Sequence, residues 1–476
     1  MVVAVFGGAA GLIAGVLSGP LWLDETLSVE IARLPLPEVY AALRQDGAPP
    51  VYYLLLKVWM AAFGTGTVAV RLLSVLLTVG ALLLAHRLGR QLGGVAGGRA
   101  ALVVLAALPW TMRFGSEARM YMLVVVLVLA GTLALLAVHR SASRRAVFAL
   151  AACVLALLLT HYWSLFLLLA VGALHLPGLL RRHPASVRVA VAGSAGALAF
   201  TPWLPTLLFQ AAHTGAPWAV PTDLAELLRT PAYWGGGSWT SRTVLAVALV
   251  ALVVLAAVRL PVARALAGVA GATLLLAWTS VAVGGGAYTG RYTAVAVPLV
   301  VVAVGLGAVA LPGRRWPLVA LGVTTLISLA TGLPSADGSR TFAGEAAAAF
   351  RASAAPGDLL VSCPDQLGPP MARLLGPAYQ QVVYPSLAAP QRIDWVDYRA
   401  RQDAADPAVV AGRVDALAGD RRVFVLLARD YRTFEGDCEE LLRALRQRRG
   451  TAERLYGTFG SNDPLLVRFP RPRATP

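Results

Sequence analysis

The sequence carries little charge for its length. Only 14% of its 476 residues are Asp, Glu, Lys or Arg, whereas 57% are hydrophobic and the mean hydropathy is +0.67. Soluble globular proteins usually contain about 25% charged residues. This shortage of charge excludes an ordinary soluble enzyme and predicts a membrane protein.

Several motifs are also lacking. No glycine-rich loop follows a predicted strand in the pattern of a P-loop or a dinucleotide-binding fingerprint, and no internal repeat is present. The six histidines show no metal-ligand spacing. Of three cysteines, Cys153 lies in an apolar run, whereas Cys363 and Cys438 lie in the C-terminal region, where an oxidising compartment would permit a disulfide.

Long apolar runs are abundant. Crossing about 30 Å of hydrocarbon takes about 20 helical residues. Eleven runs approach this length, and we expect them to span the membrane: 2–19, 67–86, 100–114, 120–138, 146–160, 162–180, 187–208, 243–258, 265–283, 292–311 and 316–333.

The net charge of +16 lies almost entirely in the membrane part, with 22 Lys or Arg against 8 Asp or Glu in residues 1–333. Arginines cluster in alternate short connections, whereas a nucleic-acid-binding protein would gather them on one surface. Short positive loops stay in the cytoplasm, so we expect the N-terminus inside and the C-terminus outside. The arginines of these connections are Arg87, Arg90, Arg99, Arg140, Arg144, Arg145, Arg181, Arg182, Arg188, Arg259, Arg264, Arg314 and Arg315.

The acidic residues of the membrane part all fall in the opposite set of loops, so the acidic face is expected outside. The first external loop, 20–66, is long, and we expect interfacial helices in it: one with Leu27, Ile31 and Leu34 on one face, and one at Val51–Phe63, which is too short to span. The N-terminal run lacks a basic segment before it and is interpreted as a retained anchor. The loop 209–242 is either a lid or an ordinary connector.

Residues 334–476 have a soluble composition. Strand-like and helix-like stretches alternate there, which predicts a small external α/β domain after a membrane domain at 1–333. The expected strands are Asp358–Ser362, Gln381–Tyr384, Arg422–Ala428, Arg454–Thr458 and Leu465–Phe469, and the expected helices are 341–354, 406–418 and 435–449.

An external site has no access to cytosolic ATP or nucleotide sugars. A sugar on a polyprenyl phosphate is the natural donor, because its tail lies in lipid and its phosphate lies at the outer surface. Such a site needs a base for the acceptor hydroxyl and cations for the departing phosphate. Asp24 and Glu25 are candidates for the base. The candidate cations are Arg71, Arg119 and Arg291.

Four stretches of the sequence carry a family resemblance. These are "LDETLSVEIA", "DGAPPVYYLLLKVWMAAFG", "VRLLSVL" and "GSEARMYML", followed more loosely by "THYWSLFLLL" and "GRYTAVAVP". The pattern resembles the GT-C class of membrane glycosyltransferases, and most of all the family 39-like group that includes the protein mannosyltransferases. The resemblance covers about residues 20–130 well.

The resemblance implies roles for particular residues. Asp24 corresponds to the catalytic Asp of the family, Glu25 to its supporting neighbour, and Glu117 to a second acidic residue with Arg119 beside it. The donor or acceptor pocket would be lined by Pro50, Tyr52, Tyr53, His161 and Tyr162.

One departure from the family pattern affects the phosphate site. Relatives often carry His or Lys before the two prolines, where this chain has Ala48. More of the phosphate binding therefore falls to Arg71, Arg119 and Arg291, with Tyr292 beside the last.

Simpler interpretations remain open for each residue. Asp24 and Glu25 also suit a helix N-terminus. Glu117 with Arg119 suits a surface ion pair, and Arg291 suits an interfacial anchor. The sequence requires no cofactor; Asp24, Glu117 and His161 would be the ligands if a divalent metal were bound.

We therefore predict an all-α polytopic glycosyltransferase with an extracytoplasmic α/β domain. It would move one sugar from a polyprenyl-phosphate donor to an acceptor hydroxyl of a glycan, lipid or protein, with inversion implied by the resemblance. The alternatives are a ligase or polymerase of polyprenyl-linked glycans and a flippase of lipid-linked sugars; few polar groups lie in the middle of the spans, which argues against the flippase. The heavy use of Arg and Ala suggests a high-GC bacterial gene, and therefore a location in a bacterial plasma membrane.

Overall fold

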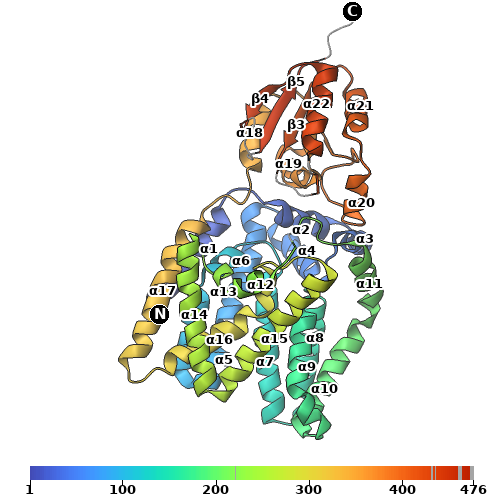
Figure 1. The fold of residues 1–476 in the computed structure, drawn as a ribbon. Helices are drawn as coiled ribbons and strands as arrows, with labels where there is room; N and C mark the ends of the chain where they lie inside the picture. Colours follow the sequence, from blue (N-terminus) through green and yellow to red (C-terminus); the bar gives the residue numbers. More distant parts are fainter. Residues whose placement is uncertain (220, 430–432, 435, 459–463, 472–476) are drawn as a thin grey trace, which may run out of the picture. The chain divides into compact units, whose positions relative to one another are not determined.

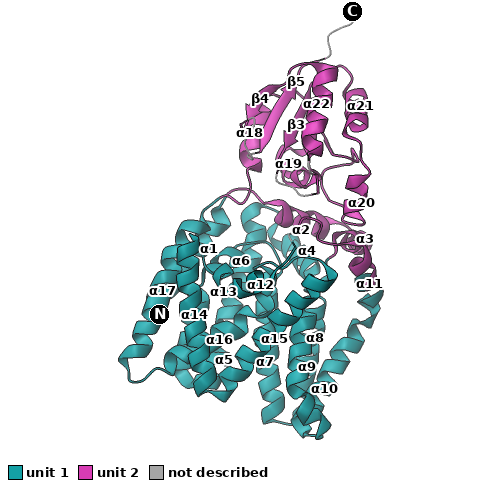
Figure 2. Ribbon diagram, in the orientation of Figure 1, with its two compact units in different colours: residues 1–18, 48–207, 220–338 teal, residues 19–47, 208–219, 339–476 magenta. Residues whose placement is uncertain are grey.

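The computed structural model describes residues 1–219, 221–429, 433–434, 436–458 and 464–471 (Figure 1). Its contacts divide the chain into two compact units (Figure 2). The first unit contains residues 1–18, 48–207 and 220–338, and the second contains 19–47, 208–219 and 339–476. The grouping thus adds part of the first external loop to the C-terminal region, and the division at 333/334 stays a prediction.

The first unit is helical. Its longer helices are α1 (Val2–Leu17), α4 (Val51–Phe63), α5 (Thr67–Ala107), α7 (Tyr121–Arg140), α8 (Arg144–Leu158), α9 (Ser164–Leu180), α10 (Pro184–Phe200), α14 (Trp239–Arg259), α15 (Pro261–Gly284), α16 (Val297–Val309) and α17 (Arg315–Ala336). Its short helices are α6 (Pro109–Gly115), η1 (Thr201–Trp203), α12 (Leu224–Leu228), α13 (Thr230–Tyr233) and η2 (Tyr292–Val295), and α11 (Leu204–His213) runs from this unit into the second.

Six helical stretches in the described residues are long and apolar enough to cross a membrane. They are Thr67–Ala107, Tyr121–Arg140, Pro184–His213, Trp239–Arg259, Pro261–Gly284 and Arg315–Ala336. Shorter apolar helices occur at Val2–Leu17, Val51–Phe63, Ser164–Leu180 and Val297–Val309. Each expected span thus lies largely within helical residues. That eleven of them cross the membrane stays a prediction.

Two of the expected spans belong to one element. The runs at 67–86 and 100–114 both enter α5, which consists of two helices joined within the arginine-containing connection. The chain folds back there, because a Cβ atom at Gly98 would stand only 2.7 Å from the His86 carbonyl oxygen. The break lies at Gly93 and Gly94, and Gly94 has a φ of 66°, a conformation that glycine adopts without steric cost. The second half of α5 ends at Ala107, because Pro109 starts a new helix.

Helix α16 is the core of the first unit. Nearly all of its residues are buried, and it contacts α5, α14 and α15. Small residues let these backbones approach closely. A Cβ atom at Gly307 would stand only 2.0 Å from the carbonyl oxygen of Leu252 on α14. The sequence of α16 is apolar on every side, as expected for a helix surrounded by other helices.

The second unit is a five-stranded sheet with helices on both faces. The strands are β1 (Leu359–Cys363), β2 (Gln380–Val383), β3 (Val423–Leu427), β4 (Glu453–Tyr456) and β5 (Leu465–Phe469), in the order β2-β1-β3-β5-β4. The first three are parallel and the last two pair antiparallel. The helices are α2 (Leu23–Arg33), α3 (Leu36–Asp46), α18 (Ala343–Ser353), η3 (Asp365–Leu367), α19 (Gly368–Leu375), η4 (Gly376–Ala378), α20 (Tyr398–Asp403), α21 (Pro407–Ala418) and α22 (Asp437–Arg449).

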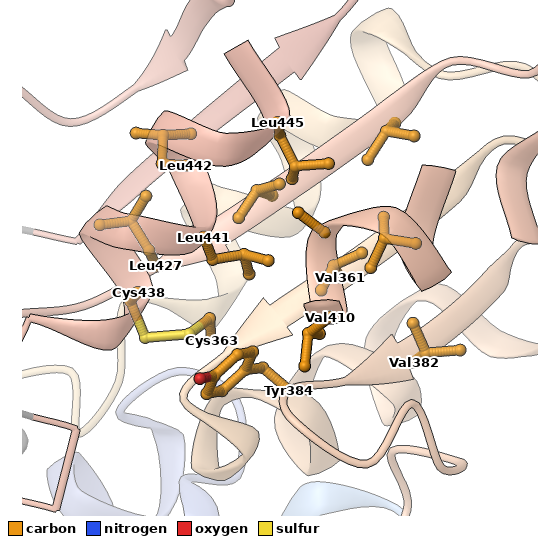
Figure 3. Packing of buried hydrophobic residues seen from close by; sticks show 14 of the residues in the cluster. Val361, Cys363, Val382, Tyr384, Val410, Leu427, Cys438, Leu441, Leu442 and Leu445 are labelled. Carbon is orange, nitrogen blue, oxygen red and sulfur yellow. A yellow bond between two sulfur atoms is a disulfide. The ribbon is translucent and has the colours of Figure 1, made fainter. Parts of the chain in front are cut away.

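Alternate strand residues fill two cores, because successive side chains of a strand point to opposite faces. Val361 and Val425 pack with α21 and α22, whereas Leu360 and Phe424 pack with α18 and α19. Cys363 at the end of β1 is bonded to Cys438 at the start of α22 (Figure 3). The disulfide that the sequence left open is therefore formed.

The expected strands and helices of this region match the observed ones within about two residues; residue 435, the expected start of the last helix, lies outside the described part of the chain. One expectation for α2 is wrong. Leu27 was expected to face a membrane interface, but it is buried in the core formed by β1, β3 and α22. The amphipathic pattern of α2 reflects packing on protein, which gives the same periodicity as packing on lipid.

The buried acid Asp365 generates a prediction about pH. It accepts a hydrogen bond from the hydroxyl of Tyr398, and burial raises its pKa from 3.8 to about 7. Between these values the folded state binds the proton and the unfolded state does not. The free energy of unfolding should therefore fall as the pH rises from about 4 to about 7.

The Asp365→Asn variant cannot ionise at this position. We expect its melting temperature, followed by tryptophan fluorescence from pH 5 to 8, to decline less with rising pH than that of the native protein. Asp403→Asn, which removes an exposed carboxylate from α20, is the control for the loss of one charge. Equal slopes for the native protein and the Asp365 variant would contradict the prediction.

Candidate active site

The acid pair lies in the first turn of α2, in the second unit. Trp22 is the N-cap residue with extended backbone angles, and its N–H donates to the Glu25 carboxylate at 3.4 Å. Asp24 precedes Glu25 in the same turn, where the partial positive charge of the helix end stabilises a carboxylate. Both acids thus lie at a helix N-terminus, as the sequence suggested.

Glu25 forms a buried ion pair. Its Oε1 lies 3.3 Å from Nη1 of Arg340, and the two side chains are 0% and 2% exposed. Sequence reasoning missed Arg340, which follows the last apolar run and has no motif around it. The pair attaches α2 to the segment that leads into the sheet, so Glu25 serves the structure whether or not it also supports chemistry.

Glu117 lies between α6 and α7 in the first unit. Its carboxylate is buried and pairs with Arg113 at 3.3 Å. Its backbone carbonyl accepts hydrogen bonds from the Ser74 hydroxyl at 2.5 Å and from the Arg119 N–H at 2.7 Å. The carboxylate of Glu117 thus pairs with Arg113, one helical turn earlier, and the ion pair with Arg119 that the sequence suggested stays a prediction.

Two arginines and a histidine come together in the first unit. His161 lies in the turn between α8 and α9, Arg119 precedes α7, and Arg291 precedes η2. His161 is buried, and burial together with the charges of Arg119 and Arg291 lowers its pKa to about 3. The imidazole is therefore neutral at physiological pH.

The tautomer of His161 follows from one hydrogen bond. The backbone N–H of Trp163 donates to Nδ1 at 3.2 Å. Because Nδ1 accepts, the proton of the neutral ring must be on Nε2, which is a donor. The cluster of Arg119, His161 and Arg291, here called the cationic cluster, thus presents N–H donors on three side chains.

Aromatic rings surround the cationic cluster. The ring of Tyr292 lies 5.2 Å from that of His161 and 5.5 Å from that of Trp163, and the guanidinium carbon of Arg291 lies 5.3 Å from the Tyr292 ring. Tyr121 is also close to His161, at 6.3 Å. The guanidinium group of Arg291 therefore lies within cation–π distance of the Tyr292 ring.

The loop that carries Arg291 is held by two indoles. Trp110 Nε1 donates to the Gly290 carbonyl, and Trp234 Nε1 donates to the Thr293 hydroxyl, each at 2.9 Å. Trp234 belongs to the long loop 209–242, whose described residues include α12 and α13. This part of the loop therefore positions Arg291. Whether the loop also closes as a lid stays a prediction.

Pro50, Tyr52 and Tyr53 lie at the start of α4. The Val51 N–H donates to the Leu159 carbonyl at 3.0 Å, which brings this helix to the end of α8. Both tyrosines are fully buried, and the Tyr53 hydroxyl accepts from Arg119 Nη1 at 3.5 Å. Tyr53 therefore joins the cationic cluster.

The remaining candidates have structural partners. Arg71 is fully buried in α5, and its Nη1 donates to the Val16 carbonyl of α1 at 3.0 Å. The Tyr162 hydroxyl accepts from Trp203 Nε1 at 2.9 Å and its ring packs with the ends of α8 and α10. A phosphate contact for Arg71 and a pocket role for Tyr162 stay predictions.

The structure thus brings together one part of the predicted site. Tyr53, Arg119, His161, Arg291 and Tyr292 form one cluster in the first unit. Asp24 and Glu25 belong to the second unit. Among the described residues, no group of three or more His, Cys, Asp or Glu side chains is placed to hold a metal ion.

The buried pair on α2 generates a stability prediction. Arg340→Met leaves the Glu25 carboxylate buried without this partner, which should lower the free energy of unfolding of the second unit by about 3 kcal/mol or more. Arg443→Met removes an exposed partner of Glu440 on α22 and should cost less than about 1 kcal/mol. Hydrogen exchange of the α2 amides and thermal unfolding measure the difference. Similar small effects for the two variants would contradict a structural role of the pair.

Comparison with protein-family models and with curated proteins found no match. Comparison with solved structures found several. ArnT from Cupriavidus metallidurans, solved with bound undecaprenyl phosphate, aligns over 98% of this chain and 97% of its own, with a TM-score of 0.62 and 13% identity.

Two other solved structures are similar over nearly the whole of this chain. The mycobacterial arabinofuranosyltransferase AftD aligns over 99% of this chain and 40% of its own, with a TM-score of 0.55 and 16% identity. The oligosaccharyltransferase of Archaeoglobus fulgidus aligns over 97% and 74%, with a TM-score of 0.51 and 11% identity. The chain therefore has the fold of the GT-C membrane glycosyltransferases.

Proposed function

We propose that this protein is a membrane glycosyltransferase that moves one sugar from a polyprenyl-phosphate donor to an acceptor hydroxyl outside the cytoplasm. The observation that carries the proposal is the cationic cluster, which gathers two guanidinium groups and an N–H donor beside aromatic rings. Such a group of donors suits the phosphate of a lipid-linked sugar.

The fold gives independent support. ArnT was solved with undecaprenyl phosphate, a lipid with an anionic head on a long apolar tail. Two of the similar proteins are named as transferases, one of arabinofuranosyl groups and one of oligosaccharides. The long apolar helices of the first unit suit a donor whose tail lies in lipid. We propose that the reaction takes place at the outer face of a bacterial plasma membrane.

Asp24 is the proposed general base. Its carboxylate accepts the proton of the acceptor hydroxyl while the acceptor oxygen forms a bond to the anomeric carbon. The bond between that carbon and the phosphate oxygen breaks, and polyprenyl phosphate leaves with the electron pair. Attack opposite the leaving group inverts the anomeric centre, as in the family that the sequence resembles. Glu25 holds the helix turn that carries Asp24.

Arg119 and Arg291 are proposed to bind the donor phosphate, with His161 donating through Nε2. The negative charge on the phosphate grows as the glycosidic bond breaks, so fixed cations stabilise the transition state more than the ground state. A neutral imidazole contributes a hydrogen bond without repelling the two arginines. The side of the site that receives the donor would be lined by Pro50, Tyr52 and Tyr53. Glu117 would hold Arg113 beside the donor.

Asp24→Asn tests the assignment of the base. Purified protein is incubated with a panel of labelled polyprenyl-phosphate sugars and candidate acceptors. We expect the variant to lose about 100-fold or more in kcat, because general-base catalysis commonly contributes that much. Binding of polyprenyl phosphate should be unchanged, since Asn cannot accept the proton yet keeps the size of Asp. Undiminished transfer by the variant would remove Asp24 from this role.

Arg291→Gln tests the phosphate site. Loss of one charged hydrogen-bond donor should weaken binding of polyprenyl phosphate about tenfold or more. Arg314→Gln, in the expected cytoplasmic connection before α17, is the matched control for loss of one arginine from the first unit. Native mass spectrometry with increasing lipid measures both. Equal weakening by the two variants would indicate non-specific attraction and contradict the proposed site.

A further inference from the structure

A pocket of about 420 Å³ lies in the second unit, apart from the cationic cluster. Helix α2 forms one wall, α19 and η4 form another, and β2 with the loop after it closes the rest. This volume is within the usual range for small-molecule sites. Its charged and polar lining residues are Glu30, Arg33, Arg373, Tyr379, Gln381 and Gln391.

Three charged side chains meet at the pocket. The Oε1 atom of Glu30 lies 3.1 Å from Nη1 of Arg33 and 3.8 Å from Nη1 of Arg373. One carboxylate therefore faces two guanidinium groups. Glu25, which is paired with Arg340, also acts on Arg373, so three arginines and two carboxylates leave an excess of one positive charge. Glu30 and Arg373 are largely shielded from solvent, with exposed fractions of 16% and 18%. This charge balance favours an anionic ligand.

The other walls offer hydrogen bonds and flat apolar surface. Gln381 donates through Nε2 to the Gly376 carbonyl at 3.0 Å, and its Oε1 accepts no hydrogen bond from the described residues. The Tyr379 ring is held edge-on against Phe350, at 4.9 Å between ring centres. A sugar ring combines hydroxyl groups with an apolar C–H face, and this lining suits both.

The pocket shares an element with the proposed base. Glu30 and Arg33 lie on α2, the helix that begins with Asp24 and Glu25. Six residues separate Asp24 from Glu30, which corresponds to about 9 Å along the helix axis at 1.5 Å per residue. Because the pair of Glu25 and Arg340 fixes this helix within the second unit, a ligand in the pocket is held at a set distance from Asp24.

We propose that this pocket binds an anionic saccharide, as the part of the acceptor that lies beyond the reacting hydroxyl. The identification of the saccharide as part of the acceptor rests on the proposed glycosyl transfer, whereas its binding can be measured without a donor. A carboxylate or phosphate on the saccharide contacts Arg33 and Arg373. Its hydroxyls are bound by Glu30 and Gln381, and a ring face packs on Tyr379.

Calorimetry of the full-length protein in detergent tests the pocket. The probes are trigalacturonate, phosphorylated maltotriose, neutral maltotriose and an acidic peptide of matched charge. We expect saturable binding of both anionic saccharides. Arg373→Gln and Arg33→Gln should weaken it about tenfold. Arg443→Gln, which removes an arginine from a similar i,i+3 pair with Glu440 on α22, is the matched control and should leave it unchanged.

Three outcomes would overturn the proposal: no saturable binding of either anionic saccharide, equal binding of the neutral sugar or the peptide, or equal weakening by the Arg443 control. Asp24→Asn separates the two proposals, because it should abolish transfer and leave saccharide binding intact. Binding that depends on Arg373 in a protein that transfers no sugar would support the pocket and reject the enzyme. Transfer that depends on Asp24, in a protein whose saccharide binding does not depend on Arg373, would support the enzyme and reject the pocket.

Discussion

The buried ion pair between Glu25 and Arg340 is the constraint on which the second unit and its proposed chemistry depend. It joins the first turn of α2 to a residue 315 positions later in the chain, where local sequence preference has no influence. Removing either partner leaves a buried charge, which is far more costly than losing an exposed pair. The position of Asp24 within the second unit, and that of the pocket at the other end of α2, follow from this attachment.

The first unit supplies a different kind of preorganisation. Arg291 is held because Trp110 and Trp234 bond the backbone and a hydroxyl of its loop, and His161 is oriented because the Trp163 N–H donates to Nδ1. Groups fixed in this way need little reorganisation when charge develops on a phosphate. Helix α16, packed closely on its neighbours, carries η2 and the end of this loop on a rigid base.

Much of this organisation could be predicted from the sequence. Long apolar runs located the helices of the first unit, and short strand-like apolar runs between helix-like stretches located the five strands of the second. The acids Asp24 and Glu25 indicated a helix N-terminus. Arg340, Arg113 and the indoles could not be predicted, because their partners are distant in sequence or their residue type has many uses. A connection between the runs at 67–86 and 100–114 was expected, and the break at Gly93 and Gly94 lies within it.

The face of α2 shows why a pattern can be correct and its interpretation wrong. Leu27 recurs at helical spacing with Ile31, and this periodicity is the same for a helix on lipid and for one on protein. Burial of Leu27 in the core with Val361 and Val425 decides between them, and only the fold could supply that contact.

The central claim is that Arg119, His161 and Arg291 bind the phosphate of a lipid-linked sugar. Cryo-electron microscopy of the protein with polyprenyl phosphate tests it most directly. The account predicts density for the phosphate within hydrogen-bonding distance of Arg119 and Arg291, with the tail extending between the apolar helices. Density for the phosphate beside Arg87 or Arg140 instead would contradict it and favour a flippase.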